Sequence, residues 1–421
     1  MNVCPDCFAN NGLKRKIVSI RRAASTGPCR FHPSKKGVPI GAVAQIVDPV
    51  LRGLYRVASH DDTRSLDDGS PLAPVLGDLT QAEDDRIIEA LAGALESAND
   101  REAFYGADRL YALQPDSSGE HLPNWQAFQR SLMFTSRFFN PDAEQVLNEI
   151  FRGVQQLRDA DRRGPVYMIE PGMDDALIHR ARIANAPEEA QRIRANPAQE
   201  LGPPPEHLRK AGRLNPSGIQ AFYGAFDLPT CIAELRPSVG GRVMSAQFAL
   251  TRPICVLDTT RFANNPRGVN YFAPGALARA RQWHFMKTFM AEIARPVFPG
   301  DEHLHYLPTQ AVAEFLNRRF QISFAGAKRG IDAVIFRSAQ RPEGRNIVIL
   351  GDAAIVGMPG GAKPRVPEAG HGQDWLDQAA QQVRAEKPAG LIAVPETLRW
   401  TLITGAQFTS EEVLADAPDT N

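Results

Sequence analysis

The sequence lacks an excess of charge of either sign, a long apolar run and a large set of cysteines. Its 48 Lys and Arg residues balance 48 Asp and Glu residues, so net charge gives no argument that the whole protein binds nucleic acid or an anionic membrane. No stretch approaches the ~20 apolar residues of a membrane helix. The first residues, MNVCPDCFANNGLKRK, contain no apolar core of a secretory signal. Five cysteines in 421 residues disfavour a disulfide scaffold, and we expect a cytoplasmic protein.

The composition is that of a globular protein, and the length predicts two or three domains at roughly 150 residues each. Residues 1–58 combine basic side chains with three of the cysteines and are predicted to form a small metal-binding module. Residues 75–165 show the apolar spacing of a helical segment, and residues 166–400 mix short strands with helices. The polar stretch 59–74 is predicted to be a linker or long loop, and residues 401–421 an acidic tail.

The pattern after residue 165 favours an α+β fold. Strands are predicted at 167–169, 176–182, 221–226, 242–250, 254–258, 332–336 and 346–350, and helices at 229–236, 275–293 and 309–319. The strands do not alternate with helices at βαβ spacing, which predicts a largely antiparallel sheet. The glycine motifs of Rossmann and P-loop folds are absent from the sequence. Upstream, Thr80 and Glu83 predict a capping box at the start of a helix.

Four residues near the amino terminus have the spacing of a zinc site. Cys4, Cys7, Cys29 and His32 form the pattern C-x2-C-x21-C-x2-H. Thiolates and an imidazole suit Zn²⁺, and four protein ligands leave no open position for water, so the pattern predicts structural rather than catalytic zinc. Residues 1–40 also contain eight basic side chains and one acid, Asp6, a net charge of +7. We do not expect nucleic acid as a partner, because no interleaved aromatics support base stacking.

The segment 211–237 places three chemically complementary side chains on consecutive elements. Arg213 lies in a predicted turn, Tyr223 in a short aromatic strand, and Glu234 in a helix that Asp227 can cap. An arginine fork can bind a pyrophosphate, and a phenol ring can pack against an aromatic group. A carboxylate can hold a ribose hydroxyl and stabilise an oxocarbenium-like centre. The alternative is an arginine stacked on aromatic rings, with the glutamate on a solvated helix face.

Five motifs in this part of the chain resemble the RES-domain family. They are LIHRAR (177–182), GRLNPSG (212–218), AFYGAFDLPTCIAELRP (221–237), YLPTQAVAEFL (306–316) and GIDAVIFRSAQRPEGRNIVIL (330–350), in the order of the family. The amino-terminal CPDCFANNGLKRK…CRFH resembles the zinc-knuckle module that precedes RES or HEPN domains in longer bacterial proteins. The resemblance implies a RES domain over 166–400, with a zinc-knuckle module over 1–58.

The resemblance implies an ADP-ribosyltransferase-like fold, a largely antiparallel split sheet with helices. It also implies an enzyme that consumes NAD⁺, either a glycohydrolase or phosphorylase that cleaves the nicotinamide–ribose bond, or an ADP-ribosyltransferase. Many members are toxins of toxin–antitoxin pairs, so a cognate antitoxin or immunity protein is a possible partner. The sequence leaves open the final acceptor, which can be water, phosphate or a protein.

The resemblance also assigns roles to individual residues. Arg180 and Arg213 would clamp the NAD⁺ phosphates, and Tyr223 would pack against the nicotinamide end. Glu234 would hold the nicotinamide ribose and stabilise its cationic transition state. The remaining contacts would come from the 338–346 region, where Ser338 would hydrogen-bond the substrate or orient an arginine and Asn346 would fix the same strand pair. Small toxins of the family often have an aromatic residue after the first arginine, where this chain has Ala181.

Two functions of other classes remain open from the sequence. One is a non-catalytic, zinc-dependent binding protein with a nucleotide-sensing RES-like domain, and the other is a zinc-anchored nucleic-acid effector. Three further patterns are interpreted as structural or accidental. They are the pair Arg279 and His284 of a short ribonuclease signature, the pair His303 and His305 as metal ligands, and the thiols Cys231 and Cys255 among apolar residues.

Overall fold

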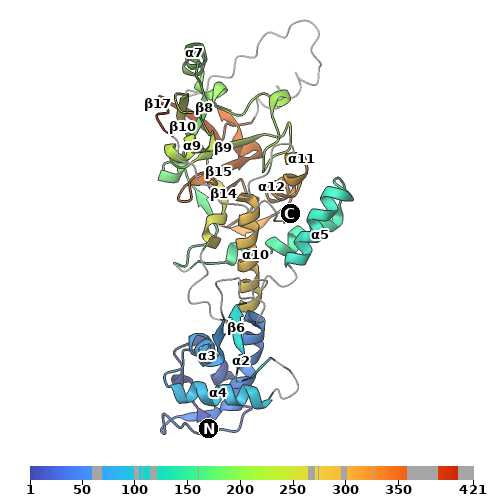
Figure 1. The fold of residues 1–421 in the computed structure, drawn as a ribbon, viewed down its shortest axis with the longest axis vertical. Coiled ribbons are helices and arrows are strands. Elements are labelled where there is room, and N and C mark those ends of the chain that lie inside the picture. The colour runs from blue at the N-terminus through green and yellow to red at the C-terminus, as the bar shows by residue number, and fades with distance from the viewer. Residues whose placement is uncertain are drawn as a thin grey trace, which may run out of the picture. The chain divides into compact units, whose positions relative to one another are not determined.

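Two compact units divide the chain (Figure 1). One consists of Met1–Phe128, Asn148–Gly164 and Arg261–Phe289, and the other of Gln129–Leu147, Pro165–Thr260 and Met290–Asn421. The structure is a computed structural model, and it describes residues 1–58, 69–98, 104–106, 108–113, 121–159, 161–263, 271–273, 275–294, 301–324, 326–357 and 387–405. Of the predicted linker over 59–74, residues 59–68 lie outside the described residues, and residues 70–74 are not linker but form β5 (Ser70–Pro71) and the start of α3 (Leu72–Thr80). Of the predicted tail over 401–421, residues 401 and 402 end β17 (Leu391–Leu402), and residues beyond 405 lie outside the described residues.

The amino-terminal unit begins with short strands around a single helix. Its described strands form two small sheets, in the orders β1-β3-β2 and β4-β6-β5. The strands are β1 (Asn2–Val3), β2 (Gly27–Pro28), β3 (Lys36–Pro39), β4 (Tyr55–Val57), β5 (Ser70–Pro71) and β6 (Leu110–Leu113). The helices of this unit include α1 (Asn11–Ile20), α2 (Ile40–Leu54), α3 (Leu72–Thr80) and α4 (Asp85–Ala98). The next helices along the chain, α5 (His121–Phe134) and α6 (Pro141–Phe151), each have residues in both units.

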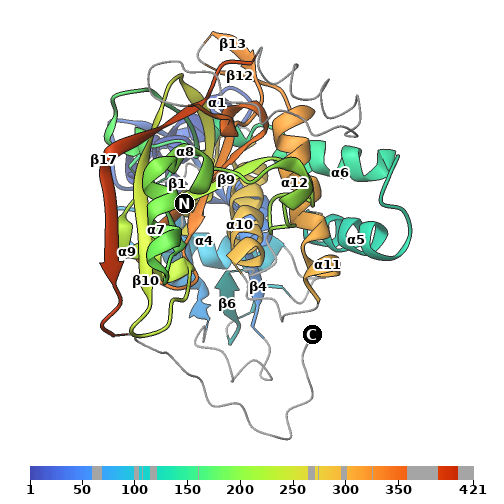
Figure 2. The ribbon, with the colours of Figure 1, turned by 90° about the horizontal axis from the view of Figure 1, so that it is seen from above.

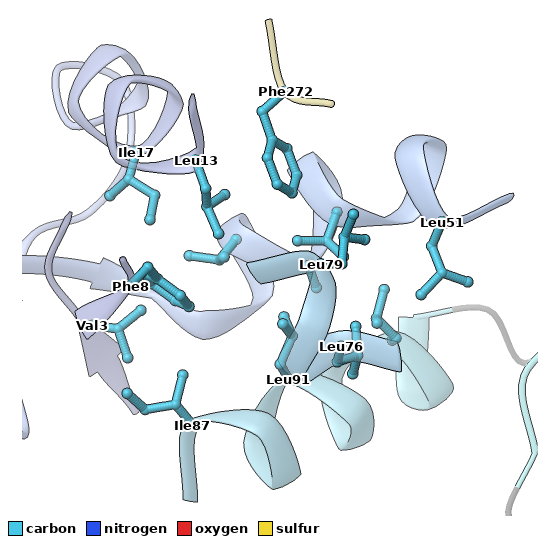
Figure 3. Close-up of a cluster of buried hydrophobic side chains, with 14 of the residues drawn as sticks. Val3, Phe8, Leu13, Ile17, Leu51, Leu76, Leu79, Ile87, Leu91 and Phe272 are labelled. Atoms are coloured by element: carbon cyan, nitrogen blue, oxygen red, sulfur yellow. The ribbon is translucent and has the colours of Figure 1, made fainter. Parts of the chain in front are cut away.

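One apolar core holds this unit together (Figure 3). Val3 and Phe8 from the start of the chain meet Leu13 of α1, Leu76 of α3 and Leu91 of α4, and each of these side chains is fully buried. The α1 residues Leu13 and Ile17 are one turn apart, as expected for the apolar stripe of a surface helix. The short strands of this unit are therefore fixed by the helices packed on them.

The predicted capping box at Thr80 and Glu83 is wrong. Thr80 is the last residue of α3, and its hydroxyl donates to the carbonyl of Leu76 at 2.7 Å, one turn back in the same helix. Asp84, the residue before α4, supplies the cap instead, because its carboxylate accepts from the backbone N–H of Arg86 at 2.9 Å. A threonine hydroxyl can bond either forward as a cap or backward to the preceding turn.

The second unit is built on a large sheet. Its nine described strands have the order β16-β17-β10-β8-β9-β15-β14-β11-β7, and their pairings are antiparallel except β11 with β14 and β16 with β17. The strands are β7 (Val166–Ile169), β8 (Leu177–Ile183), β9 (Ala221–Ala225), β10 (Arg242–Leu250), β11 (Ile254–Asp258), β14 (Ala333–Arg337), β15 (Arg345–Leu350), β16 (Val356–Gly357) and β17 (Leu391–Leu402). The predicted α+β class and antiparallel sheet are confirmed.

The sheet is nearly divided between β8 and β9, which pair at a single position, His179 with Ala225. Helices α7 (Pro187–Ala195) and α8 (Pro197–Glu200) cover one face of the sheet, where Ala190 and Ile193 pack with Phe222 and Met244 (Figure 2). Helix α9 (Leu228–Glu234) lies against β8, β9 and β15. The second unit also contains α11 (Glu302–His305), α12 (Leu307–Arg318), and the hairpin of β12 (Ile322–Phe324) and β13 (Ala327–Arg329). Helix α10 (Ala276–Ala294) belongs to the first unit up to Phe289.

The strands and helices predicted after residue 165 are confirmed to within about two residues. Continuous apolar runs such as ICVLD and NIVIL became buried strands, as expected for strands covered on both faces. The predicted cap of α9 is also confirmed, because the Asp227 carboxylate accepts from the backbone N–H of Thr230 at 2.8 Å. The cap fixes where α9 begins and hence where Glu234, seven residues later, ends it.

Gly224 is required where β9 passes β8. A Cβ at this position would lie 2.4 Å from Cγ2 of Ile178 and 2.8 Å from the backbone oxygen of His179. We expect Gly224→Ala to cost about 1–3 kcal/mol, because it overpacks the contact between these strands. Hydrogen exchange at the β8 and β9 amides should be faster in this variant. Gly405→Ala is the matched control, since a Cβ there meets nothing within 4 Å. Equal exchange in the two variants would contradict the prediction.

Candidate active site

Glu234 is fixed at one carboxylate oxygen by two buried donors. The Ser338 hydroxyl donates to Oε1 at 2.5 Å and the Asn346 amide donates to the same oxygen at 2.7 Å. Ser338 and Asn346 are each 5% exposed, whereas Glu234 at the end of α9 is exposed. Among the described residues no group donates to the other oxygen, Oε2. We call these three residues the carboxylate cluster; it holds one oxygen rigidly and leaves the other available to a ligand.

Ser338 is itself held in one orientation. Its Oγ accepts from the backbone N–H groups of Gln340 and Arg341, both at 3.1 Å, in the loop that follows β14. A hydroxyl has one hydrogen, so with these two bonds accepted that hydrogen is directed to Glu234. The loop is closed by the Ser338 N–H, which donates to the carbonyl of Gly344 at 2.9 Å.

Asn346 brings an unsatisfied acceptor to the carboxylate cluster. It lies on β15 opposite Ala225 of β9, the strand that leads into α9. Its Nδ2 donates to Glu234, and its Oδ1 is buried without a hydrogen-bond partner among the described residues. A buried acceptor in this condition is uncommon in a native structure, and a polar ligand or water is a usual partner for such an atom.

Arg213 lies in a turn, residues 210–219, that we call the arginine turn. Buried Asn215 organises it, because its Nδ2 lies within 3.2 Å of the carbonyls of Lys210, Pro216 and Ile219. Gln310 of α12 donates to the carbonyls of Gly212 and Asn215, at 2.8 and 3.1 Å. The Arg213 guanidinium lies 5.1 Å from the centre of the Tyr306 ring. The arginine is therefore held by a braced backbone and an aromatic face.

Tyr223 connects β9 to the arginine turn. Its hydroxyl donates to Oδ1 of Asn215 at 2.7 Å and accepts from the backbone N–H of Leu214 at 3.1 Å. Burial raises the pKa of Tyr223 to about 12, so the phenol stays protonated and able to donate at neutral pH. Gly212 allows this approach, since a Cβ there would lie 2.5 Å from the phenol oxygen.

We expect Tyr223→Phe to loosen the arginine turn. The change leaves the Leu214 N–H and the Asn215 Oδ1 without the phenol, at a cost of about 1–3 kcal/mol. Hydrogen exchange over residues 210–219 should rise accordingly. Tyr306→Phe is the matched control: it keeps the ring beside Arg213, so its effect should stay within about 0.5 kcal/mol. The hydroxyl of Tyr223 has no such role if both variants exchange alike.

Arg180 is bound to the main chain. Its side chain is half-buried, and its guanidinium donates to the backbone oxygens of Leu201 and Tyr223 and lies 4.9 Å from the Phe222 ring centre. Burial lowers the pKa of Arg180 to about 10, which leaves it charged at neutral pH. Because Arg180 is on β8 and Tyr223 on β9, this contact joins the two halves of the sheet where the strands share a single pair.

The sequence-predicted residues thus fall into linked groups. Glu234, Ser338 and Asn346 are in direct contact, whereas Arg213 is linked to Tyr223 through the arginine turn. Arg180 reaches the same strand through the carbonyl of Tyr223. Sequence reasoning identified the turn at Asn215 but missed that its side chain braces Arg213, and it missed Gln310 and Tyr306 as supports. The Asn-Pro-Ser-Gly sequence was the available signal for the turn.

Residues 181–365 match the family model described as RES domain. The segment is a RES domain. The match begins one residue after Arg180 and contains Arg213, Tyr223, Glu234 and the 338–346 region. The resemblance is thereby confirmed for the four motifs between residues 212 and 350, whereas the first motif, LIHRAR, overlaps the match only at Ala181 and Arg182. No curated protein and no solved structure matched the chain.

Outside the RES domain, the predicted zinc ligands lie together. The ligand atoms of Cys4, Cys7, Cys29 and His32 are all within 4.8 Å of one another, and the three cysteines are buried. Sγ of Cys7 is 3.5 Å from Sγ of Cys29, and Nδ1 of His32 is 3.4 Å from Sγ of Cys4. Three thiolates and one imidazole at these separations fit a tetrahedral Zn²⁺. We call residues 1–39 the zinc module.

The other candidate sites have structural explanations. Cys231 and Cys255 are buried, and burial raises the pKa of their thiols to about 12 and about 11. A protonated, buried thiol is a poor nucleophile. His303 and His305 are exposed on α11 and belong to no group of metal-ligating side chains in the described residues. None of the helices in the described ranges is both long and apolar enough to cross a membrane.

Proposed function

We propose that this RES domain cleaves the bond between nicotinamide and ribose in NAD⁺. The observation that carries the proposal is the carboxylate cluster, in which Glu234 is held by Ser338 and Asn346 at Oε1 and is open at Oε2. A carboxylate fixed in this way costs little reorganisation when positive charge develops next to it. The match of residues 181–365 to the RES-domain family supports the same assignment, because resemblance to that family implies NAD⁺ as the substrate.

The main task of the enzyme in this reaction is to stabilise developing charge. Nicotinamide leaves as a neutral molecule when the C1′–N bond breaks, and positive charge builds on the ribose ring. In the proposal, Oε2 of Glu234 accepts from a ribose hydroxyl and stabilises that charge, as carboxylates do in glycoside cleavage. The unsatisfied Oδ1 of Asn346 is a second acceptor beside the same carboxylate and can take a donor of the bound nucleotide.

The two arginines take different roles in this proposal. Arg213, half-buried in the arginine turn, binds the pyrophosphate, because a planar guanidinium matches phosphate oxygens. Arg180 acts as a positioning residue: it is bound to backbone oxygens and orients β9, on which Tyr223 lies. Tyr223 holds the arginine turn and offers its ring edge to the nicotinamide end.

The wider role we propose is that of a toxin-type effector in the cytoplasm, where NAD⁺ is consumed and cysteines stay reduced. A cognate antitoxin or immunity protein is then the expected partner. Expression of the wild-type chain without a partner should lower cellular NAD⁺ and arrest growth. Expression of Glu234→Gln at the same level should do neither, and arrest by both chains would contradict the toxin role.

Mass spectrometry of the products tests the chemistry. The purified chain is incubated with NAD⁺ in buffers with and without phosphate. Nicotinamide should appear in both, and its co-product identifies the acceptor: free ADP-ribose for water, ADP-ribose 1-phosphate for phosphate, or a protein heavier by one ADP-ribose. Stabilisation of the chain by NAD⁺ with no turnover would instead favour the non-catalytic, nucleotide-sensing alternative.

A further inference from the structure

A basic surface surrounds the zinc cluster. The side chains of the zinc module carry a net charge of +7, and three thiolates with one Zn²⁺ leave +6. Arg15, Lys16, Arg22, Arg30 and Lys36 are all exposed, and none of them forms an ion pair within the described residues. The module's one acid, Asp6, forms ion pairs with Lys35 at 2.6 Å and with Lys14 at 4.0 Å. The charge is therefore presented to solvent rather than neutralised locally.

The fold gathers these cations on neighbouring elements. Leu13 and Ile17 of α1 face the core, so Arg15 and Arg22 lie on the opposite, outward face of that helix and its end. The Arg21 guanidinium donates to the backbone oxygen of Lys36 at 2.6 Å, which ties the end of α1 to β3. Strand β3 pairs in turn with β2, immediately before Cys29. The basic surface thus runs from α1 across β3 to the zinc knuckle.

The chemistry of this surface fits a phosphate backbone. In the zinc module the aromatic residues are Phe8, which is fully buried, and Phe31, which is half-buried with Arg86 5.1 Å from its ring. The surface therefore offers no ring on which a base could stack. Its exposed large hydrophobics are Met1 and Val18, too few for the apolar centre of a protein interface or for insertion into a membrane.

We propose that the zinc module binds the phosphate backbone of double-stranded nucleic acid without reading its sequence. From sequence, nucleic acid was not the expected partner, because aromatics for stacking are missing, and a zinc-anchored nucleic-acid effector was left as an alternative. Duplex backbones need no stacking, since their phosphates lie outside and are recognised by charge. The proposal is independent of the proposed NAD⁺ chemistry, which uses residues of the RES domain.

Fluorescence anisotropy with the full-length, zinc-loaded chain tests the proposal. The probes are a labelled DNA duplex and an RNA duplex of scrambled sequence, titrated at several salt concentrations. Binding should weaken steeply with salt and differ little between unrelated sequences. The double variant Arg15→Gln, Arg22→Gln should bind at least about 10-fold more weakly at low salt, and the slope of log K against log salt should fall by about 2.

The matched control is Arg137→Gln with Arg192→Gln, which removes two exposed arginines outside the zinc module. It should bind as the wild type does, and zinc content should be unchanged in both double variants. Equal loss in both double variants, or no duplex binding at low salt, would overturn the proposal. So would binding to phosphatidylserine-containing vesicles in the absence of duplex binding, which would identify a membrane-surface site. A difference between the DNA and RNA probes would show which duplex the module prefers.

Discussion

Glu234→Gln is expected to slow the release of nicotinamide from NAD⁺ by at least about 100-fold. The amide keeps the shape of the side chain and can still accept from Ser338 and Asn346. It removes the negative charge that, in our proposal, stabilises the cationic ribose. The loss should therefore appear in kcat, with a smaller change in KM, because the interaction strengthens in the transition state.

The control for this variant is Glu188→Gln, which neutralises another exposed glutamate of the same unit, on α7. It should keep the wild-type rate. Both variants should retain the thermal stability of the wild type within experimental error, since both side chains are exposed. If Glu234→Gln turns over NAD⁺ at the wild-type rate, another group must stabilise the transition state, and the assignment of Glu234 fails.

Cys29→Ala is expected to abolish zinc binding and to loosen the strands around the zinc cluster. The strands β1, β2 and β3 are two to four residues long, so their own pairing is too short to hold the module. Structural zinc sites contribute apparent binding free energies of about 10–16 kcal/mol in small zinc domains, and one lost thiolate removes most of this. Amides of β2 and β3 should then exchange rapidly, while those of α1, which packs on the apolar core through Leu13 and Ile17, and of β15 in the RES domain keep their protection.

Metal content and hydrogen exchange, both measured on the full chain, decide this prediction. The wild type should hold about one zinc per chain, as a four-ligand structural site does. His305→Ala provides the control, because this histidine is exposed and outside the zinc cluster; it should keep the metal and the exchange pattern. A Cys29→Ala chain that keeps stoichiometric zinc would show that Cys29 is not a ligand.

The secondary structure of the RES domain followed from local sequence, because apolar runs and turn residues act over a few positions. The start of α9 is an example: Asp227 was predicted to cap this helix, and the cap is present. The wrong prediction of a capping box at Thr80 also has a local cause. Its hydroxyl had two available partners, and the choice between them depended on whether α3 extended to that residue, which the capping pattern alone does not decide.

The carboxylate cluster could not follow from spacing. Ser338 and Asn346 are 104 and 112 residues from Glu234 in sequence, and they meet it because β15 pairs with β9. Only the resemblance to a family connected these positions. The bonds of Arg180 to two backbone oxygens were equally hidden, since they depend on the gap between β8 and β9. The zinc ligands could be predicted from sequence, because Cys4 and Cys7, like Cys29 and His32, are only three residues apart.

A proton NMR time course of NAD⁺ with the purified wild-type chain tests the central claim most directly. The resonances of the nicotinamide ring that is still attached to ribose in NAD⁺ should decay. Those of free nicotinamide should grow, to an amount well beyond one turnover per chain. A folded, zinc-loaded chain that leaves the NAD⁺ spectrum unchanged, even at equimolar protein, would contradict the account.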